Sequence, residues 1–305
     1  MNIFKYFKRK ETTVEKDIPD RIINPLYIKN ENDRHNYMKQ GYVIIKNVVE
    51  DEIIENVLKL HDEISIMDGY FESDKLQTSI AFGETIHKKV VQEIQKLSIG
   101  IFDKILDPKL CIYDFGGGII IKNKGGWFQP HQDCSIIDEY KGTTSYAWMP
   151  TVDMTTENGT FYAIAGSHLW AAWQRSSQHP DWPLKKYEQF LWNQMEPLFL
   201  NKGDLLLFDS ALIHASGANT TNEKRIAFNA CIIEKNAQHV QYFQDKKNKK
   251  GTIEKYLVDL EYWYKGNLWG KPQGYEKITE KLVYPSQLLS EHYLKNLIAK
   301  YKTKS

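Results

Sequence analysis

The sequence predicts a mainly β protein with flanking helices, of the sandwich or barrel class that includes the double-sheet jelly roll. The middle of the chain consists of short apolar or alternating runs divided by Gly, Asn and Asp, which is typical of strands and turns. Helical periodicity flanks this region, and no alternating β-α-β rhythm is present. The predicted strands are residues 111–113, 119–121, 146–152, 160–165, 205–208 and 226–233.

Helices are expected before the strand region. Residues Glu31–Gln40 predict a short helix that Gly41 stops, and an apolar strand follows at residues 42–45. Apolar residues recur at helical spacing from Asp51 onward, and Ile86–Ile105 repeats the pattern. We expect these helices to flank a sheet.

Three segments make up the predicted domain organisation. Residues 1–27 form a flexible basic leader, and residues 28–235 form a jelly-roll domain with a Trp-rich insertion at 167–201. Residues 236–305 form a C-terminal helical extension packed on the core, with helical patterns around 253–260 and 286–301. The lysine-rich run at 245–251 predicts an exposed loop.

Composition excludes several classes of partner. The 40 Lys and Arg residues nearly balance 39 Asp and Glu residues, so a formal charge of +1 provides no general field for nucleic acid or an anionic membrane. No apolar run approaches the roughly 20 residues of a membrane span, so stable membrane insertion is not expected. Three cysteines without a C-x-x-C pair fit a reducing compartment, which predicts a cytoplasmic protein. The oligomeric state is left open.

The triplet His131-Gln132-Asp133 is the first candidate for chemistry. Residues i and i+2 of a strand point to the same side, so the imidazole and the carboxylate would form half of a metal site. A second triplet, His179-Pro180-Asp181, has the same spacing. We reject it because Pro180 cannot donate to a sheet ladder and lies in the insertion.

A distant segment supplies the other half of this site. Gly203-Asp204 predicts a turn before an apolar strand, and His214 follows that strand after a short break. Two histidines and one carboxylate form the facial triad of non-heme Fe(II) oxygenases, which leaves positions open for a cosubstrate and dioxygen. Arg225 opens the next strand, where its guanidinium could bind a carboxylate through two hydrogen bonds. Triad and anion anchor together indicate 2-oxoglutarate as cosubstrate.

These residues resemble the phytanoyl-CoA dioxygenase family of Fe(II)- and 2-oxoglutarate-dependent oxygenases, over roughly residues 31 to 235. The resemblance implies a double-stranded β-helix, which is a cupin-like jelly roll. The motifs that carry it are Gly41-Tyr42-Val43-Ile44-Ile45, His131-Gln132-Asp133, Ala147-Trp148, Glu157-Asn158-Gly159-Thr160, Ala165-Gly166-Ser167-His168, Gly203-Asp204, His214-Ala215-Ser216-Gly217-Ala218-Asn219 and Arg225.

The resemblance also implies roles for single residues. His131, Asp133 and His214 would bind iron, and Arg225 would bind the distal carboxylate of 2-oxoglutarate. The remaining residues implied for the cosubstrate pocket are Ser216, Lys122, Trp148 and, as a weaker match, Gln132.

The implied reaction is hydroxylation of an unactivated C–H bond in a small molecule or a carrier-bound acyl substrate, with O2 consumed and succinate and CO2 released. Related halogenases lack the carboxylate ligand, so Asp133 favours hydroxylation over halogenation. Desaturation, epoxidation and cyclisation stay open as other outcomes of the same oxidising chemistry. The loop at 124–131 and the insertion depart from the family pattern, so the family's founding substrate, a branched fatty acyl-CoA, is not carried over.

Two other classes of function stay open. A non-catalytic jelly-roll binding protein could keep the fold without the chemistry, although the intact triad and Arg225 argue against it. A cupin-like hydrolase or isomerase could use another divalent metal, but that chemistry needs no anchor for a dicarboxylate.

Structural roles, and not metal or substrate binding, are expected for several neighbouring residues. We expect His168 to be a hydrogen-bonded loop residue, Asp209 to support the structure, Cys134 to be buried and inert, and residues 116–118 to form a bulge or sharp turn. The insertion is where substrate contacts are expected, since loops over a rigid scaffold usually set specificity. Its candidate residues are Trp170, Trp173, Arg175, His179 and Trp182, although each tryptophan taken alone is better explained as a core aromatic.

Overall fold

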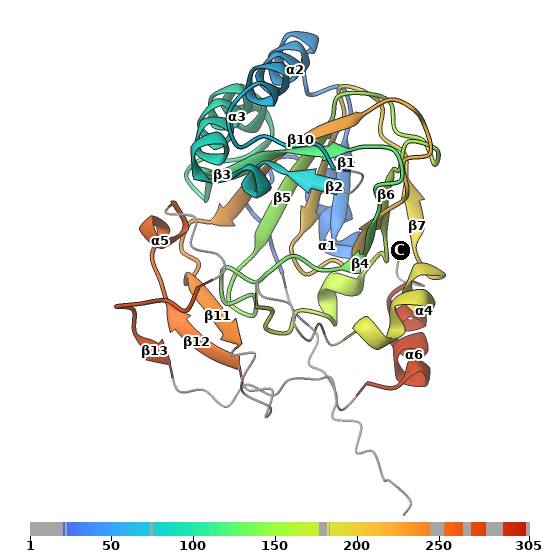
Figure 1. The fold of residues 1–305 in the computed structure, drawn as a ribbon. Coiled ribbons are helices and arrows are strands. Elements are labelled where there is room, and N and C mark those ends of the chain that lie inside the picture. Colours follow the sequence, from blue (N-terminus) through green and yellow to red (C-terminus); the bar gives the residue numbers. More distant parts are fainter. Residues whose placement is uncertain are drawn as a thin grey trace, which may run out of the picture.

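The computed structural model describes residues 21, 23–73, 76–176, 182, 184–244, 253–264, 270–278 and 289–302. Figure 1 shows two β sheets at the centre, with helices on their outer faces. The helices are α1 (Glu31–Gln40), α2 (Asp51–Ser65), α3 (Glu84–Ile105), α4 (Glu188–Trp192), α5 (Leu260–Tyr264) and α6 (Glu291–Lys302), with 3-10 turns η1 (Ser79–Phe82), η2 (Ser167–Leu169) and η3 (Lys185–Tyr187). The strands are β1 (Tyr42–Ile45), β2 (Leu76–Thr78), β3 (Cys111–Lys122), β4 (Phe128–His131), β5 (Thr144–Pro150), β6 (Phe161–Ala163), β7 (Glu196–Leu198), β8 (Leu205–Asp209), β9 (His214–Ser216), β10 (Arg225–Glu234), β11 (Val240–Gln244), β12 (Ile253–Leu257) and β13 (Lys277–Ile278).

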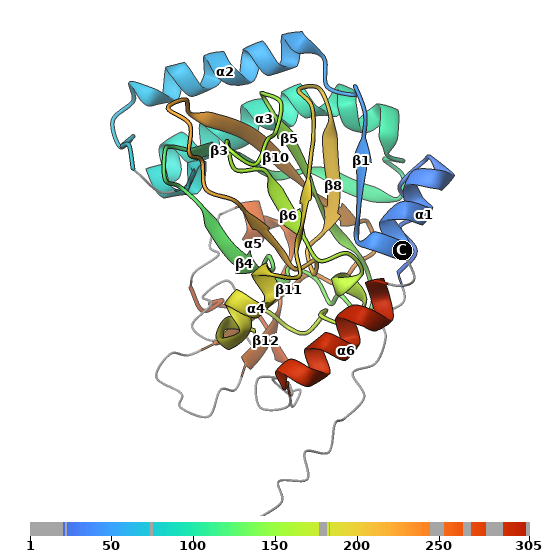
Figure 2. The same ribbon diagram turned by 90° about the vertical axis from the view of Figure 1, so that its right-hand side faces the viewer.

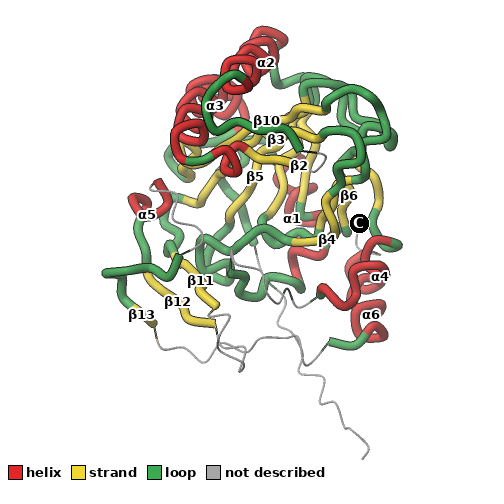
Figure 3. The backbone as a smooth tube through the Cα atoms, in the orientation of Figure 1, coloured by secondary structure: helices red, strands yellow, loops and turns green. Residues whose placement is uncertain are grey.

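Both central sheets are antiparallel. The six-stranded sheet has the order β1-β8-β5-β10-β3-β2, and the four-stranded sheet has the order β4-β9-β6-β7. Apart from β2 with β3 and β6 with β7, consecutive strands are not neighbours in these orders, because the chain crosses repeatedly from one sheet to the other (Figures 1 and 3). The predicted jelly roll is therefore confirmed. A third sheet, β11-β12-β13, lies beside this core.

Side chains alternate between the two faces of each strand. One face packs between the two sheets, and the other packs beneath the helices. On β10, Ile226 and Phe228 pack with the outer cluster of buried apolar residues, whereas Ala227 packs with the cluster between the sheets. This period of two is what a pleated strand imposes. Arg225 lies on the same face as Ala227 and is therefore directed between the sheets.

Helices cover both outer faces (Figure 2). The helices α2 and α3 lie on the six-stranded sheet. The apolar residues on the buried face of α2 recur every three or four residues, as a helix requires: Ile54, Val57, Leu60 and Ile64. The helix α6 lies on the four-stranded sheet, where Leu294 and Ile298 pack in one buried cluster with residues of the insertion.

The first helix ends where the sequence predicts. The side chain of Asn30 accepts a hydrogen bond from the N–H of Asp33, which caps the start of α1. Gly41 has a φ of 82° and donates its N–H to the carbonyl of Tyr37, which is the left-handed ending that favours glycine. The chain then enters β1 directly.

The structure joins two predicted strands into one. The strand β3 runs without a break from Cys111 to Lys122, and glycines 116–118 lie inside it. The pairing between β10 and β3 shifts register between Asn229 and Cys231, opposite the glycines. Gly117 has a φ of 131°, which glycine adopts without steric cost. The strand can therefore contain a bulge at this position and still continue its pairing with β10 on both sides.

The C-terminal part differs from its predicted helical character. Residues 253–257 are the strand β12, which pairs with both β11 and β13. A short apolar run fits a strand or a helix, and the neighbouring strands decide here. A helix is present at Glu291–Lys302, close to the predicted one. The lysine-rich run at 245–251 and the His179-Pro180-Asp181 triplet lie wholly outside the described residues.

The last residues of the predicted leader are part of the core. Tyr27 is buried and shares a hydrogen bond of 2.7 Å with the hydroxyl of Ser145, and Arg21 is also buried. None of the helices in the described part of the chain combines the length and apolar character that crossing a membrane requires.

Candidate metal centre

His131, Asp133 and His214 meet between the two sheets. His131 ends β4 and His214 begins β9, and the two residues are direct partners in the β4–β9 pairing. Asp133 follows two residues after the end of β4, and its Oδ2 lies 3.9 Å from Nε2 of His214. One potential ligand atom from each of the three residues lies within 4.8 Å of the others. A single metal ion fits this arrangement.

Backbone carbonyls fix the tautomers of both histidines. Nδ1 of His131 lies 2.9 Å from the carbonyl of Gln129, and Nδ1 of His214 lies 2.9 Å from the carbonyl of Leu212. A carbonyl can only accept, so each Nδ1 carries a proton, and in the neutral imidazole Nε2 then keeps its lone pair. This orientation of a ligand by its other ring nitrogen is usual for metal-binding histidines.

Aromatic side chains surround the ligands. The ring of Phe161 stacks on His214, with centroids 5.0 Å apart and planes 5° apart, and Phe208 contacts the same imidazole. Phe128 meets His131 edge-on at 4.1 Å. Burial lowers the pKa of His214, partly opposed by Asp133, so the imidazole stays neutral as metal binding requires.

A buried cationic site lies on the adjacent strands. Arg225 begins β10 directly opposite Lys122 at the end of β3. Nη2 of Arg225 lies 3.5 Å from the hydroxyl of Ser216, and its guanidinium carbon lies 5.4 Å from the ring centre of Trp148. Its Nε and Nη1 are buried without a hydrogen-bond partner among the described residues. Such unpaired buried donors fit an anionic ligand.

The pKa values of the two cations show how costly their burial is. Desolvation lowers the pKa of Arg225 to about 10. Desolvation, followed by the charge of Arg225, lowers the pKa of Lys122 to about 6. A carboxylate bound between these groups would compensate both effects.

Lys122 also fixes the turns around the pocket. Its Nζ donates to the carbonyl of Gly217 at 2.7 Å and to the carbonyl of Gly159 at 3.3 Å, and it contacts the hydroxyl of Ser216. Gly159 has a φ of 79°, and a Cβ atom at this position would overlap the carbonyl oxygen of Gly217. No larger residue therefore fits there.

Gln132 lies apart from this group. Its amide donates to the carbonyls of Ala171 at 2.8 Å and Ala211 at 2.5 Å, and its oxygen accepts from the indole of Trp182 at 3.3 Å. Its side chain therefore connects the insertion to the segment before His214.

His168, Asp209 and Cys134 lie near the site but were expected to have structural roles only. His168 is a buried residue whose Nε2 lies 3.2 Å from the carbonyl of Met38, and Asp209 accepts from Arg21 at 2.8 Å. Both interpretations are confirmed. Cys134 is half-buried rather than buried, and burial with the charge of Asp133 raises the pKa of its thiol to about 12, which leaves it protonated.

Among the described residues of the insertion, Trp170, Trp173 and Arg175 are buried, whereas the candidate His179 lies outside the described residues. Trp170 and Trp173 are buried in the apolar cluster that α6 covers, as the core interpretation predicts. Arg175 is also buried and is bonded to Glu139 at 2.6 Å. Sequence reasoning missed Glu139, because no local motif links it to a partner 36 residues away.

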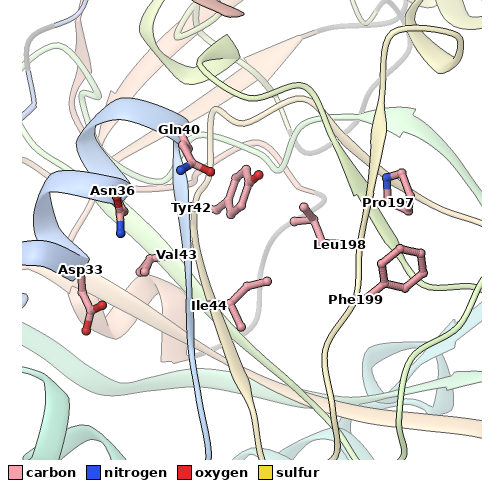
Figure 4. A pocket seen from close by; sticks show the side chains of 9 residues that line it. All are labelled: Asp33, Asn36, Gln40, Tyr42, Val43, Ile44, Pro197, Leu198 and Phe199. Carbon is pink, nitrogen blue, oxygen red and sulfur yellow. The ribbon is translucent and has the colours of Figure 1, made fainter. Parts of the chain in front are cut away.

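A surface groove of about 430 Å³ lies elsewhere, between α1, β1 and β7 (Figure 4). It contains none of the metal-binding or anion-binding candidates. Its lining residues are Asp33, Asn36, Gln40, Tyr42, Val43, Ile44, Pro197, Leu198 and Phe199.

Comparisons with known proteins agree with these features. The model of the family described as phytanoyl-CoA dioxygenase (PhyH) matches residues 37–227. A Dictyostelium discoideum protein named phytanoyl-CoA dioxygenase domain-containing protein 1 homolog is 29% identical over 146 residues, which are 45% of this chain and 49% of the relative. Phytanoyl-CoA dioxygenase 1 of Oryza sativa subsp. japonica is 26% identical over 50% of this chain and 63% of its own length. The chain thus spans about half the length of the curated relatives it matches.

Similar solved structures include the non-heme alpha ketoglutarate dependent epimerase SnoN from nogalamycin biosynthesis. It is 18% identical, with a TM-score of 0.49, over 68% of this chain and 84% of that chain. HygX from Streptomyces hygroscopicus, solved with nickel and 2-oxoglutarate, is 14% identical, with a TM-score of 0.49, over 68% and 88%. The family model covers well over half of this chain and includes all three metal-binding candidates and Arg225, so the chain belongs to the phytanoyl-CoA dioxygenase family.

Proposed function

We propose that this protein is an Fe(II)- and 2-oxoglutarate-dependent dioxygenase. It hydroxylates an unactivated C–H bond of a small molecule or a carrier-bound acyl substrate and releases succinate and CO2. One observation carries the proposal: the strand that supplies the ligand His214 also supplies Ser216, whose hydroxyl lies 3.5 Å from the buried Arg225 with its two unpaired donors. A hydrolase or isomerase that used the metal alone would need no such anchor.

The donor set suits Fe(II). Two imidazoles present Nε2 and one carboxylate completes the face, which is the triad of non-heme iron oxygenases and leaves the remaining positions open. When bound, Fe(II) together with 2-oxoglutarate and O2 supplies the oxidising chemistry, while the protein supplies binding and orientation.

The cationic site would hold the far end of the cosubstrate. Nη2 of Arg225, paired with either Nη1 or Nε, can donate two hydrogen bonds to the distal carboxylate. The Ser216 hydroxyl donates to the carbonyl of Gly159 at 3.0 Å and can turn to add a further hydrogen bond to the carboxylate. Lys122 adds positive charge from the opposite strand, and the ring of Trp148 lies against the guanidinium. We leave Gln132 out of this set because its side chain bonds backbone groups on another side.

Aromatic side chains would exclude water from the reacting atoms. Phe161, Phe208 and Phe128 lie against the two histidine ligands. Fewer competing waters strengthen the electrostatic contacts inside the pocket and protect a reactive centre from side reactions.

Formation of succinate tests the proposal. Purified protein with Fe(II), 2-oxoglutarate and O2 is expected to form succinate slowly even without a substrate. Replacing Asp133 with Ala is expected to abolish this turnover, whereas the same replacement at the exposed Asp153 leaves it unchanged. A folded wild-type protein that forms no succinate, or an Asp133→Ala variant with full turnover, contradicts the proposal.

A further inference from the structure

A buried ion pair lies next to the metal ligands. The side chains of Arg175 and Glu139 are 1% and 2% exposed. Two parallel hydrogen bonds join them, from Nη1 to Oε2 at 2.8 Å and from Nη2 to Oε1 at 2.6 Å. The third edge of the same guanidinium is directed elsewhere, since Nε donates to the backbone carbonyl of Asp133 at 2.6 Å.

Arg175 bonds the loop at that carbonyl and again two residues beyond it. The strand β4 ends at His131, so Asp133 lies beyond the hydrogen-bonded ladder of the strand. Two residues further on, the N–H of Ser135 donates to the carbonyl of Arg175 at 3.1 Å, and the Ser135 hydroxyl accepts from the N–H of Arg175 at 3.3 Å. These bonds fix the backbone that carries the carboxylate ligand.

Glu139 extends the same network toward His214, a second metal ligand. Its Oε1 accepts from the hydroxyl of Ser210 at 2.6 Å. Ser210 is adjacent to Asp209, whose Oδ1 accepts from the N–H of Ala211 at 2.8 Å, in the turn that leads into His214. One buried pair therefore connects the two loops from which the ligands come.

We propose that Arg175, held by Glu139, is a positioning residue for the metal ligand Asp133. The inference rests on the proposed function, because it assigns a role at the same metal centre. A guanidinium is suited to this role because its planar donors bind a carboxylate in two places and leave Nε for the carbonyl. Partners of this kind orient the ligand atoms, and their loss typically lowers metal affinity about 10- to 100-fold.

Three variants separate positioning from simple stability. Arg175→Lys keeps the charge opposite Glu139 but cannot also donate to the Asp133 carbonyl. The double variant Arg175→Met with Glu139→Leu replaces the whole pair with apolar side chains, which is often neutral for stability. Asp204→Ala is the control, since it removes another buried carboxylate with three hydrogen bonds at the far end of β8.

The measurement is Co(II) binding to the metal-free proteins by titration calorimetry, together with the visible Co(II) absorption and the unfolding midpoint. We expect Arg175→Lys and the double variant to bind Co(II) about 10- to 100-fold more weakly. The double variant should unfold near the wild-type midpoint, and the control should lose stability but keep wild-type affinity.

Wild-type Co(II) affinity and absorption in both Arg175→Lys and the double variant overturn the inference. Affinity losses that follow the unfolding midpoint across all variants, the control included, also overturn it. A wild-type protein that binds no Co(II) contradicts the proposed function itself, which is a separate result.

Discussion

At the residue scale, the least ordinary feature is a pair of basic side chains enclosed between two sheets. Arg225 and Lys122 face each other across β10 and β3, and burial lowers the pKa of both. Keeping such groups uncompensated costs free energy, which a dicarboxylate ligand would recover on binding.

This arrangement makes cosubstrate binding depend on pH. The pKa of Lys122 is about 6 in the free protein, and a bound carboxylate raises it. Above pH 6 the free lysine is mostly neutral, so binding takes up a proton and the affinity falls as pH rises, by up to about tenfold per pH unit. Titrating 2-oxoglutarate into metal-loaded protein, in buffers with different ionisation enthalpies, measures this uptake. Lys122→Met should abolish it; unchanged uptake in that variant contradicts the assignment.

His168 makes the stability of the fold depend on pH in the acidic range. Burial, followed by the positive charge of Arg21, lowers its pKa from 6.5 to about 3. The unfolded chain binds a proton below pH 6.5 while the folded protein does not, so this stability is present above 6.5 and is lost as pH falls toward 3.

At about pH 5 this effect of His168 amounts to about 2 kcal/mol of unfolding free energy. Urea unfolding at neutral pH and near pH 5 measures it. His168→Gln should show a shallower loss between the two pH values, and equal losses in both proteins would argue against a neutral buried imidazole.

At the element scale, the junction between α1 and β1 depends on one glycine. A Cβ atom on Gly41 would lie 2.5 Å from Nδ1 of His168, and Gly41 has a φ of 82°. Gly274 has a similar φ of 79° but no atom within 4 Å of that position. Comparing substitutions at these two glycines therefore separates the cost of backbone strain from the cost of steric overlap with His168.

We expect Gly274→Ala to lose about 1–2 kcal/mol of unfolding free energy from the left-handed backbone alone. Gly41→Ala should lose clearly more, because the helix ending and the His168 ring cannot both keep their positions. Urea midpoints of the two variants give the comparison, and equal losses would show that His168 moves aside freely.

Strong local signals predicted the elements of the fold. The Gly41 ending, the periodicity of α2 and α3, and the apolar runs of β8 and β10 all give the observed elements. Residues 253–257 were assigned wrongly, because a five-residue run does not distinguish the two periods and pairing with β11 and β13 decides.

The candidate site was predictable only in part. His131, Asp133, His214 and Arg225 fall in short motifs. The structure brings the first three together and places Arg225 3.5 Å from Ser216, on the strand that begins with His214. The pair of Arg175 with Glu139 depends on tertiary contacts that leave no pattern in the sequence.

At the scale of the whole molecule, buried charges tie distant segments together. Arg21 donates to Asp209 at 2.8 Å, to the carbonyl of Glu139 at 2.6 Å and to the carbonyl of Gly142 at 3.0 Å. The residues before the first helix are thus bonded to both loops beside the metal centre.

Removing this cation should weaken the entire fold. Arg21→Met leaves the fully buried Asp209 without its cation and is expected to cost about 3–5 kcal/mol of unfolding free energy. Lys46→Met breaks a pair with Asp204 whose lysine is 55% exposed, and it should cost at most about 1 kcal/mol. Urea unfolding checks both; equal costs would contradict the distinction.

The central claim is that the triad and Arg225 form one site for Fe(II) and 2-oxoglutarate. The most direct test is anaerobic addition of 2-oxoglutarate to the Fe(II)-loaded protein while the visible charge-transfer absorption of the chelate is recorded. We predict a band in the wild type that is absent in His214→Ala and that needs far more 2-oxoglutarate in Arg225→Met. No band in the folded wild-type protein, or an unchanged band in His214→Ala, would contradict the account.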